Sequence, residues 1–203
     1  MTTENKPYPV TLKGELTSPP GRWQWIFKWL LGIPHYFILY FLGIAAFVIM
    51  VIAFFAILFT GKYPKSLFDF VLGVMRWYWR VSFYSYSVLG TDKYPPFSLD
   101  PDPNYPADLD IKYPEKLNNG LVLVKWILAF PHWVILWLFG YVLPFLVIAA
   151  AICQLFLGKY PEGLFKVVLG MQRWMYRVYA YLEMCDEYPP FKFWEDLGIG
   201  LAV

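Results

Sequence analysis

The sequence predicts an all-α integral membrane protein built from two tandem copies of one helical unit. Of its 203 residues, 59% are hydrophobic and only 16% are charged, whereas soluble domains are nearer half apolar and a quarter charged. Two runs of 25 residues, Tyr36–Thr60 and Trp133–Leu157, contain no charged side chain, and about 20 apolar residues cross a bilayer. A soluble protein of this length could hardly wrap two such helices, so the chain falls in the membrane class.

The first copy divides into a polar arm, an interfacial helix, an apolar run and a second helix. Residues 1–21 are rich in Pro and are expected to be extended. Arg22–Ile33 places apolar side chains at helical spacing among three tryptophans, which is typical of a short helix in the headgroup region. Pro34-His35 is expected to turn the chain into the apolar run. After the Gly61–Pro64 turn, we expect a second helix over Leu67–Gly90.

The same pattern returns 97 residues later, so that Pro34-His35 recurs as Pro131-His132. Between residues 61–84 and 158–181, 14 of 24 positions are identical. A repeat of this strength predicts two similar units about a pseudo-twofold axis. The predicted divisions are residues 1–97 for membrane repeat 1, 98–104 for the start of an acidic Pro-rich linker, 105–191 for membrane repeat 2, whose first residues continue the linker, and 192–203 for a C-terminal tail.

The linker between the copies, over residues 98–119, contains four prolines and four aspartates. It is too polar for a membrane and too rich in Pro for a helix. We expect a solvated loop, with docking of a partner as the alternative.

Each copy carries a helix with two arginines on a narrow polar face. On a helical wheel at 100° per residue, the polar residues of the first of these helices, including both of its arginines, fall within an arc of about 80°. If these helices span the membrane, Asp69 is the only acid within them, and its counterpart in the second copy is Lys166. The helices therefore lack the acids needed to neutralise their four arginines. Phospholipid headgroups, carboxylates of a partner, or carbonyls and tyrosines of the same bundle must satisfy them. The candidate lipid- or partner-binding residues are Arg76, Arg80, Arg173, Arg177, Tyr84 and Tyr181.

The arginine helix is compatible with two arrangements. If it spans, each repeat is an interfacial helix plus a helical hairpin and the protein has four spans, but each mid-bilayer arginine costs about 2.5–3.5 kcal/mol. If it lies in the interface, the arginines meet lipid phosphates and the protein has two spans. Only the first arrangement brings the matching entry and exit motifs of both copies to one face of the membrane. We therefore favour four spans and keep two spans plus interfacial helices as the alternative.

Two further sets of residues recur at equivalent positions. His35 and His132 could hold a metal or haem, but each follows a Pro at a membrane boundary without a Cys or acid beside it, so we favour imidazoles in the headgroups and predict no cofactor. The helix-ending motif is interpreted as a rigid aromatic cap, with partner binding as the alternative. Its residues are Tyr94, Pro95, Pro96 and Phe97 in the first copy and Tyr188, Pro189, Pro190 and Phe191 in the second.

Three motifs carry a family resemblance: Gly-Lys-Tyr-Pro, Gly-x-x-Arg-Trp-x-x-Arg-Val and Asp-x-Tyr-Pro-Pro-Phe. They resemble a bacterial membrane-protein family known only as a domain of unknown function, over residues 8–97 and 105–191. The resemblance implies a bacterial membrane protein and no activity. We expect a multi-pass protein of the inner (cytoplasmic) membrane.

The function that we infer from these patterns is non-catalytic. No Gly-rich phosphate loop, Ser-His-Asp set or paired carboxylates occurs, so we expect no enzyme. The net charge of +2 and the lack of a basic tract argue against nucleic acid. The first hypothesis is a scaffold or accessory subunit that binds membrane lipid headgroups, another membrane protein, or both. The alternative is a small transporter or channel with an arginine-lined anion or lipid path.

Overall fold

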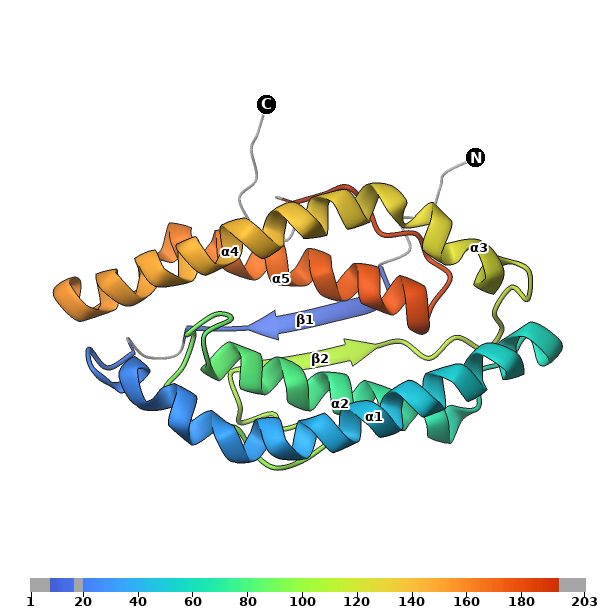
Figure 1. Cartoon of the computed structure of the whole chain (residues 1–203), viewed down its shortest axis with the longest axis horizontal. Helices are drawn as coiled ribbons and strands as arrows, with labels where there is room; N and C mark the ends of the chain where they lie inside the picture. Colours follow the sequence, from blue (N-terminus) through green and yellow to red (C-terminus); the bar gives the residue numbers. More distant parts are fainter. Residues whose placement is uncertain (1–7, 17–19, 194–203) are drawn as a thin grey trace.

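The chain forms three layers: a two-stranded sheet, two inner helices and two outer helices (Figure 1). The computed structural model describes residues 8–16 and 20–193. The strands are β1 (Val10–Gly14) and β2 (Ala107–Ile111), the inner helices are α2 (Lys65–Tyr84) and α5 (Glu162–Glu183), and the outer helices are α1 (Lys28–Thr60) and α4 (Phe130–Leu157). The short helices η1 (Gln24–Phe27) and α3 (Leu121–Leu128) precede the outer helices. Each copy thus supplies one strand, one inner helix and one outer helix.

The sheet joins the two copies, because β1 belongs to the first and β2 to the second. The strands are antiparallel, with Val10 opposite Ile111. Leu12 and Leu109 face the inner helices and are buried, whereas the side chain of Asp110 is 74% exposed. This alternation is typical of a sheet with one face packed on the core and the other face exposed.

The strands correct two expectations. The arm was expected to be an extended polar segment and the linker a solvated loop, yet residues 10–14 and 107–111 pair with each other. Residues 1–7 and 17–19 of the expected arm lie outside the described residues, as does most of the expected tail.

The outer helices are the two described helices that are long and apolar enough to cross a membrane, with η1 counted into the first. Only 17% of the residues in the most apolar stretch of each are buried, unlike the core helices of a soluble protein. The expected four spans are not confirmed, because α2 and α5 are amphipathic and do not meet this criterion.

Helix boundaries differ from expectation at two places and agree at a third. α1 continues through Pro34 without a turn, because a proline near the start of a helix removes only one backbone hydrogen bond. In the second copy α3 and α4 are separated at Ala129, close to the expected position. α2 ends at Tyr84 rather than Gly90, since Ser85 is extended and Leu89 adopts a positive φ of 58°.

The Gly-Lys-Tyr-Pro motif makes the turn between the outer and the inner helix of each copy. Gly61 and Gly158 have φ values of 67° and 65°, the left-handed conformation that ends many helices and suits glycine. The tyrosines of the motif, Tyr63 and Tyr160, are buried. The repeated motif is therefore explained by helix termination and packing.

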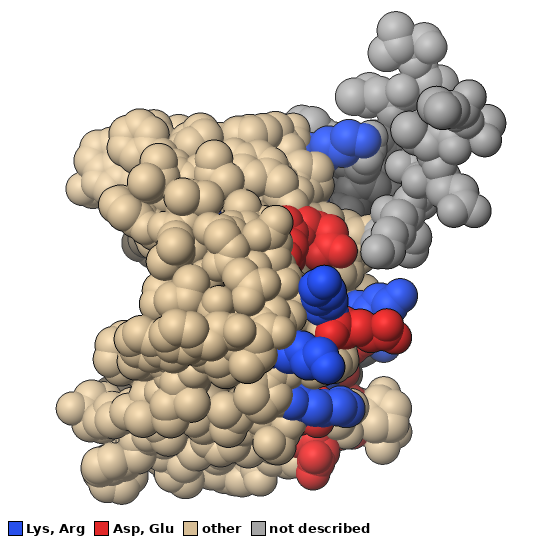
Figure 2. All heavy atoms as spheres, turned by 90° about the vertical axis from the view of Figure 1, so that its right-hand side faces the viewer, with Lys and Arg blue, Asp and Glu red and all other residues tan. Residues whose placement is uncertain are grey.

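The surface has an apolar side and a charged side. In Figure 2, Lys, Arg, Asp and Glu lie on one side of the visible face, and the opposite side is free of them. Most of the exposed large apolar side chains belong to α1 and α4. The outer helices thus form the apolar side, and the strands lie in the layer farthest from them.

The strand register can be tested by cross-linking. Thr11 and Asp110 are directly opposite each other and exposed, so cysteines there should oxidise to a disulfide, because opposite Cα atoms lie about 4.5–5.5 Å apart, within the range that a disulfide spans. The diagonal pair of cysteines at Thr11 and Asp108 should link much less. Mass spectrometry of the linked peptides measures both; equal yields would contradict the register.

Candidate functional site

The first arginine of α2 lies against β2. Arg76 Nε donates to the Leu109 carbonyl at 2.9 Å, and Nη1 donates to the Leu99 carbonyl at 3.0 Å. Its guanidinium also forms ion pairs with Asp108 at 3.3 Å and Asp110 at 3.7 Å. The linker, and not the helix itself, therefore supplies the acids that Arg76 requires.

Arg80 lies one turn further along and is fully buried. Its Nη2 donates to the Asp100 carbonyl at 2.7 Å and to Asp108 Oδ1 at 3.0 Å. Asp108 is thus shared by both arginines of α2. Buried charges need such pairing, because an isolated one costs several kcal/mol, so these two arginines have a structural role.

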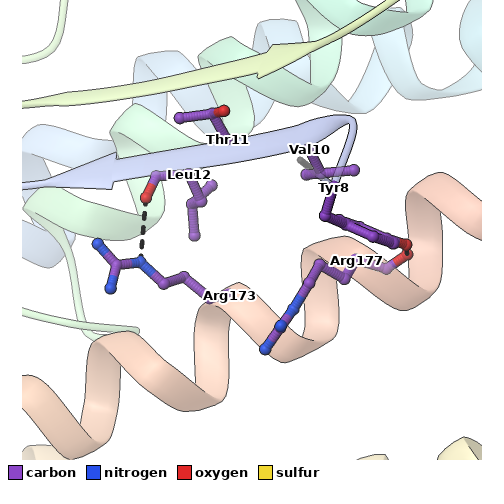
Figure 3. A pocket seen from close by; sticks show the side chains of 6 residues that line it. All are labelled: Tyr8, Val10, Thr11, Leu12, Arg173 and Arg177. Carbon is purple, nitrogen blue, oxygen red and sulfur yellow. Dashed lines mark hydrogen bonds between the residues drawn. The ribbon is translucent and has the colours of Figure 1, made fainter. Parts of the chain in front are cut away.

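The second copy repeats this arrangement between α5 and β1 (Figure 3). Arg173 Nε donates to the Leu12 carbonyl at 3.2 Å, and Arg177 Nη2 donates to the Lys192 carbonyl at 2.9 Å. Leu12 corresponds to Leu109 at the offset of 97 residues. The same helix-to-strand hydrogen bond therefore forms in both copies.

The strands differ, however, in the side chains that flank this bond. Where β2 has Asp108 and Asp110, β1 has Thr11 and Lys13. Beside β1 there is a cavity of about 240 Å³. The residues that line it are Tyr8, Val10, Thr11, Leu12, Arg173 and Arg177 (Figure 3). Among the described residues, those that line this cavity present two guanidinium groups and two hydroxyls, and none of them is a carboxylate.

A tyrosine that precedes the strand lies beside each pair of arginines. Tyr8 Oη donates to the Glu187 carbonyl at 3.1 Å, and Tyr105 Oη donates to the Lys93 carbonyl at 3.1 Å. Burial raises the pKa of both phenols, so they remain neutral donors. These tyrosines belong to the Tyr-Pro pairs that precede the strands, and they anchor each strand to the chain that follows the inner helix.

The other two predicted tyrosines, Tyr84 and Tyr181, contact lysines rather than the arginines. Lys28 Nζ lies 5.0 Å from the centre of the Tyr84 ring and 2.8 Å from Asp92. In the second copy Lys125 takes the same place over Tyr181, at 5.5 Å, beside Asp186 at 2.8 Å. Both lysines are at least 97% buried, so these clusters pin the start of each outer helix to the end of the inner one.

The two histidines are enclosed by protein, so their imidazoles do not contact lipid headgroups, contrary to expectation. Each is fully buried, and each Nδ1 accepts a hydrogen bond of 3.0 Å from a tryptophan of the inner helix, Trp77 for His35 and Trp174 for His132. His35 stacks on Phe97 with ring centres 4.0 Å apart. Pairing with tryptophan requires a neutral imidazole with its proton on Nε2, so both rings serve packing.

The Tyr-Pro-Pro-Phe motif folds back over the start of the outer helix. Tyr94 Oη donates to the Leu31 carbonyl at 3.0 Å, and Tyr188 Oη donates to the Leu128 carbonyl at 3.1 Å. In the second copy, Phe191 stacks on its histidine at 4.2 Å. These contacts are those of the aromatic cap; Pro95, Pro96, Pro189 and Pro190 complete it, and partner binding stays a prediction.

A polar stripe on α5 faces away from the strands, and it was not predicted from the sequence. Gln172, Tyr176, Tyr179 and Glu183 follow one another at i, i+4, i+7 and i+11, a spacing that places them on one helix face. Their counterparts in the first copy are Met75, Trp79 and Ser82 of α2 and Tyr86 beyond its end. The polar stripe of the first copy, transferred to the second by the repeat offset, therefore could not reveal these residues. A separate wheel for α5 would have done so.

Groups of three or more His, Cys, Asp or Glu that could hold a metal ion do not occur within residues 8–16 and 20–193. The polar chemistry described above consists of guanidinium, phenol, carboxylate and backbone carbonyl groups.

Asp108 provides a test of the first arginine site. Asp108→Asn removes the carboxylate shared by Arg76 and Arg80, and we expect it to lower the free energy of unfolding by about 2–4 kcal/mol. Thermal unfolding in a non-ionic detergent measures the effect. Asp69→Asn is the control, because Asp69 pairs with Lys65 in the open and such pairs contribute little. Equal effects of the two substitutions would contradict a structural role of Asp108.

Comparison with known proteins gives a family and no function. No curated protein and no solved structure matches the chain. The family model described as a domain of unknown function (DUF4389) matches residues 22–98 and 119–194. Since these segments cover well over half of the sequence, the chain belongs to the DUF4389 family and carries that domain in two tandem segments.

Proposed function

We propose that the protein is a non-catalytic membrane scaffold that binds anionic lipid headgroups on its strand side. The observation that carries the proposal is the division of the surface into an apolar side and a charged side (Figure 2). The bacterial cytoplasmic membrane as its location, the pseudo-twofold relation of the copies and a role as an accessory subunit are parts of the same proposal.

The proposed placement has α1 and α4 lying along one leaflet rather than crossing the bilayer. With 33 residues, α1 is about 50 Å long, whereas the hydrocarbon core is about 30 Å thick. The strands lie beside the middle of the long helices (Figure 1), and Asp110 on β2 is exposed. If the helices crossed the bilayer, an open sheet edge and a charge would face lipid, which membranes do not tolerate.

The thickness of the layers supports this placement. Packed helices lie about 8–10 Å apart, so the strands lie roughly 20 Å from the outer helices when a similar spacing separates them from α2 and α5. α1 and α4 are apolar on nearly all sides, which suits immersion in hydrocarbon. Outer helices deep in the leaflet would then bring the strands to the level of the lipid phosphates.

The cavity between β1 and α5 is the headgroup site that we propose. A guanidinium group binds a phosphate through two parallel hydrogen bonds, and Arg173 and Arg177 both line this cavity. Beside α2, by contrast, β2 has aspartates at the equivalent strand positions, which would repel an anion. Lipid phosphate is favoured over the carboxylates of a partner protein because the strand side lies at phosphate level in this placement.

A transport path has less support than a binding site. The arginines of the first copy are occupied by the carbonyls and aspartates of the linker, so they do not line an open route. The transporter alternative would require the strand layer to separate from α2.

The placement predicts how two cysteine variants react. Lys62 and Lys159 are exposed residues that follow the C-terminal ends of α1 and α4, and these ends point in opposite directions (Figure 1). We expect Lys62→Cys and Lys159→Cys to react with a membrane-impermeant maleimide from the same side of the membrane, because both ends lie in one leaflet. Labelling in spheroplasts and in inverted vesicles measures this, with the parent protein as background. Reaction from opposite sides would establish spanning helices and refute the placement.

The headgroup site predicts a loss of bound lipid. We expect Arg173→Gln/Arg177→Gln to retain about tenfold less phosphatidylglycerol, since two charge-assisted contacts are lost. Lipid that co-purifies in mild detergent is quantified by mass spectrometry.

The control for this experiment is Lys62→Gln/Lys65→Gln, which removes the same charge elsewhere. Arg173→Lys keeps the charge without the planar fork and should fall between the two. If the arginine variant loses a co-purifying protein but keeps its lipid, the ligand is a partner's carboxylate and the lipid proposal fails.

A further inference from the structure

A second pocket lies on the apolar side, between the two outer helices. Its volume is about 460 Å³, and inner helices α2 and α5 form its floor. The lining residues are Leu39 and Gly43 of α1, Leu143 of α4, Val74, Met75, Tyr78 and Ser82 of α2, Ser87 beyond it, and Gln172, Met175, Tyr176, Tyr179 and Glu183 of α5. The pocket is thus built by both copies and lies on the side opposite to the strands.

The pocket combines apolar walls with polar groups from the stripe of α5. The Tyr176 side chain is 95% buried, and its hydroxyl has no hydrogen-bond partner among the described residues. Gln172 Nε2 donates to the Ser87 carbonyl at 3.3 Å, so its amide is already held in place. A buried hydroxyl without a partner is destabilising, so a ligand that accepts a hydrogen bond from Tyr176 would remove this cost.

Glu183 defines the chemistry that this molecule must have. None of the described residues forms an ion pair with it, and burial raises its pKa to about 7. Burial, together with the charge of Glu183, raises the pKa of the phenols of Tyr63 and Tyr179, so both are titratable groups in its surroundings. A cation that donates hydrogen bonds to the carboxylate would remove the cost of burying it.

We propose that this pocket binds the primary ammonium group of an amphiphile, with its hydrocarbon chain along the outer helices. The ammonium donates to Glu183, a polar atom of the same molecule accepts from Tyr176, and the chain packs on Leu39, Leu143 and Met175. Methionine side chains adapt readily to flexible chains. The ligand enters from the hydrocarbon, because the pocket lies between the helices that form the apolar side.

A matched pair of glycines makes the pocket testable without disturbing the fold. A Cβ atom added at Gly43 would meet nothing within 4 Å, and the same holds at Gly140, its counterpart 97 residues later. Gly43 lines the pocket and Gly140 does not. Gly43→Leu should therefore fill the pocket, while Gly140→Leu adds the same side chain outside it.

The probe is dodecylamine carrying a diazirine, applied to the full chain in a non-ionic detergent near pH 7. We expect photolabelling of peptides from α1 and α5 that border the pocket, with competition by dodecylamine but not by dodecanoate. Glu183→Gln should reduce labelling by about tenfold, because a charge-assisted contact is lost, and Glu162→Gln at the exposed start of α5 should not. Gly43→Leu should abolish labelling and Gly140→Leu should preserve it.

Competition with lipids distinguishes the two sources of the same chemistry. Phosphatidylethanolamine carries a primary ammonium and phosphatidylcholine does not, so competition by the former alone identifies a headgroup, and competition by neither lipid identifies a free long-chain amine. Tyr176→Phe should fold normally and bind the probe more weakly. Equal competition by dodecanoate, or equal labelling of the two glycine variants, would overturn the proposal. Because the assay avoids the strand side, its failure leaves the headgroup site unaffected.

Discussion

The bond between an arginine of an inner helix and the outer edge of a strand is the interaction on which this architecture depends. α2 and α5 each carry two buried or mostly buried arginines in otherwise apolar surroundings, and their guanidinium groups need acceptors. A two-stranded sheet has unpaired carbonyls on both outer edges, and Arg76 and Arg173 donate to these edges at Leu109 and Leu12. The arginines of the helices thereby supply donors to the strand carbonyls, and the strand carbonyls supply acceptors to the arginines.

This mutual dependence ties the two copies into one unit. β1 and β2 come from different copies but pair with each other, and the largest buried cluster includes residues of both, such as Trp79 and Tyr176, whose rings meet at 5.5 Å. A single copy would leave its strand unpaired and its arginines exposed. In this structure each copy therefore completes the other, and the two copies share one core.

The long, strongly patterned features could be predicted from the sequence, and the short or distant ones could not. The apolar runs and the repeat offset identify the outer helices and the arginine helices because each rests on many residues. The strands were missed, although Val10–Gly14 and Ala107–Ile111 alternate between apolar and polar residues, because five residues among prolines are a weak signal. The buried histidines were missed because their partners, such as Trp77, lie 42 residues away.

The predicted arginine sites illustrate the limit of a helical wheel. A wheel shows which residues share a face, but it cannot show that Asp108 and Asp110 approach Arg76 from another layer. Because only acids within the helices were counted, an external ligand was predicted for all four arginines. With the strands in place, that requirement is removed in the first copy, and a ligand remains a proposal for the second.

The two arginine sites differ in the strand residues beside them. This difference distinguishes a site with a structural role from a site that we propose to bind a ligand. Asp108 and Asp110 neutralise the first site from within, whereas Thr11 and Lys13 at the same strand positions add no negative charge to the second. On the opposite side, α5 has Gln172, Tyr176 and Glu183 where the first copy has Met75, Trp79 and Tyr86. α5 thus has polar groups that face cavities on both of its sides. Both proposed binding sites therefore depend on α5.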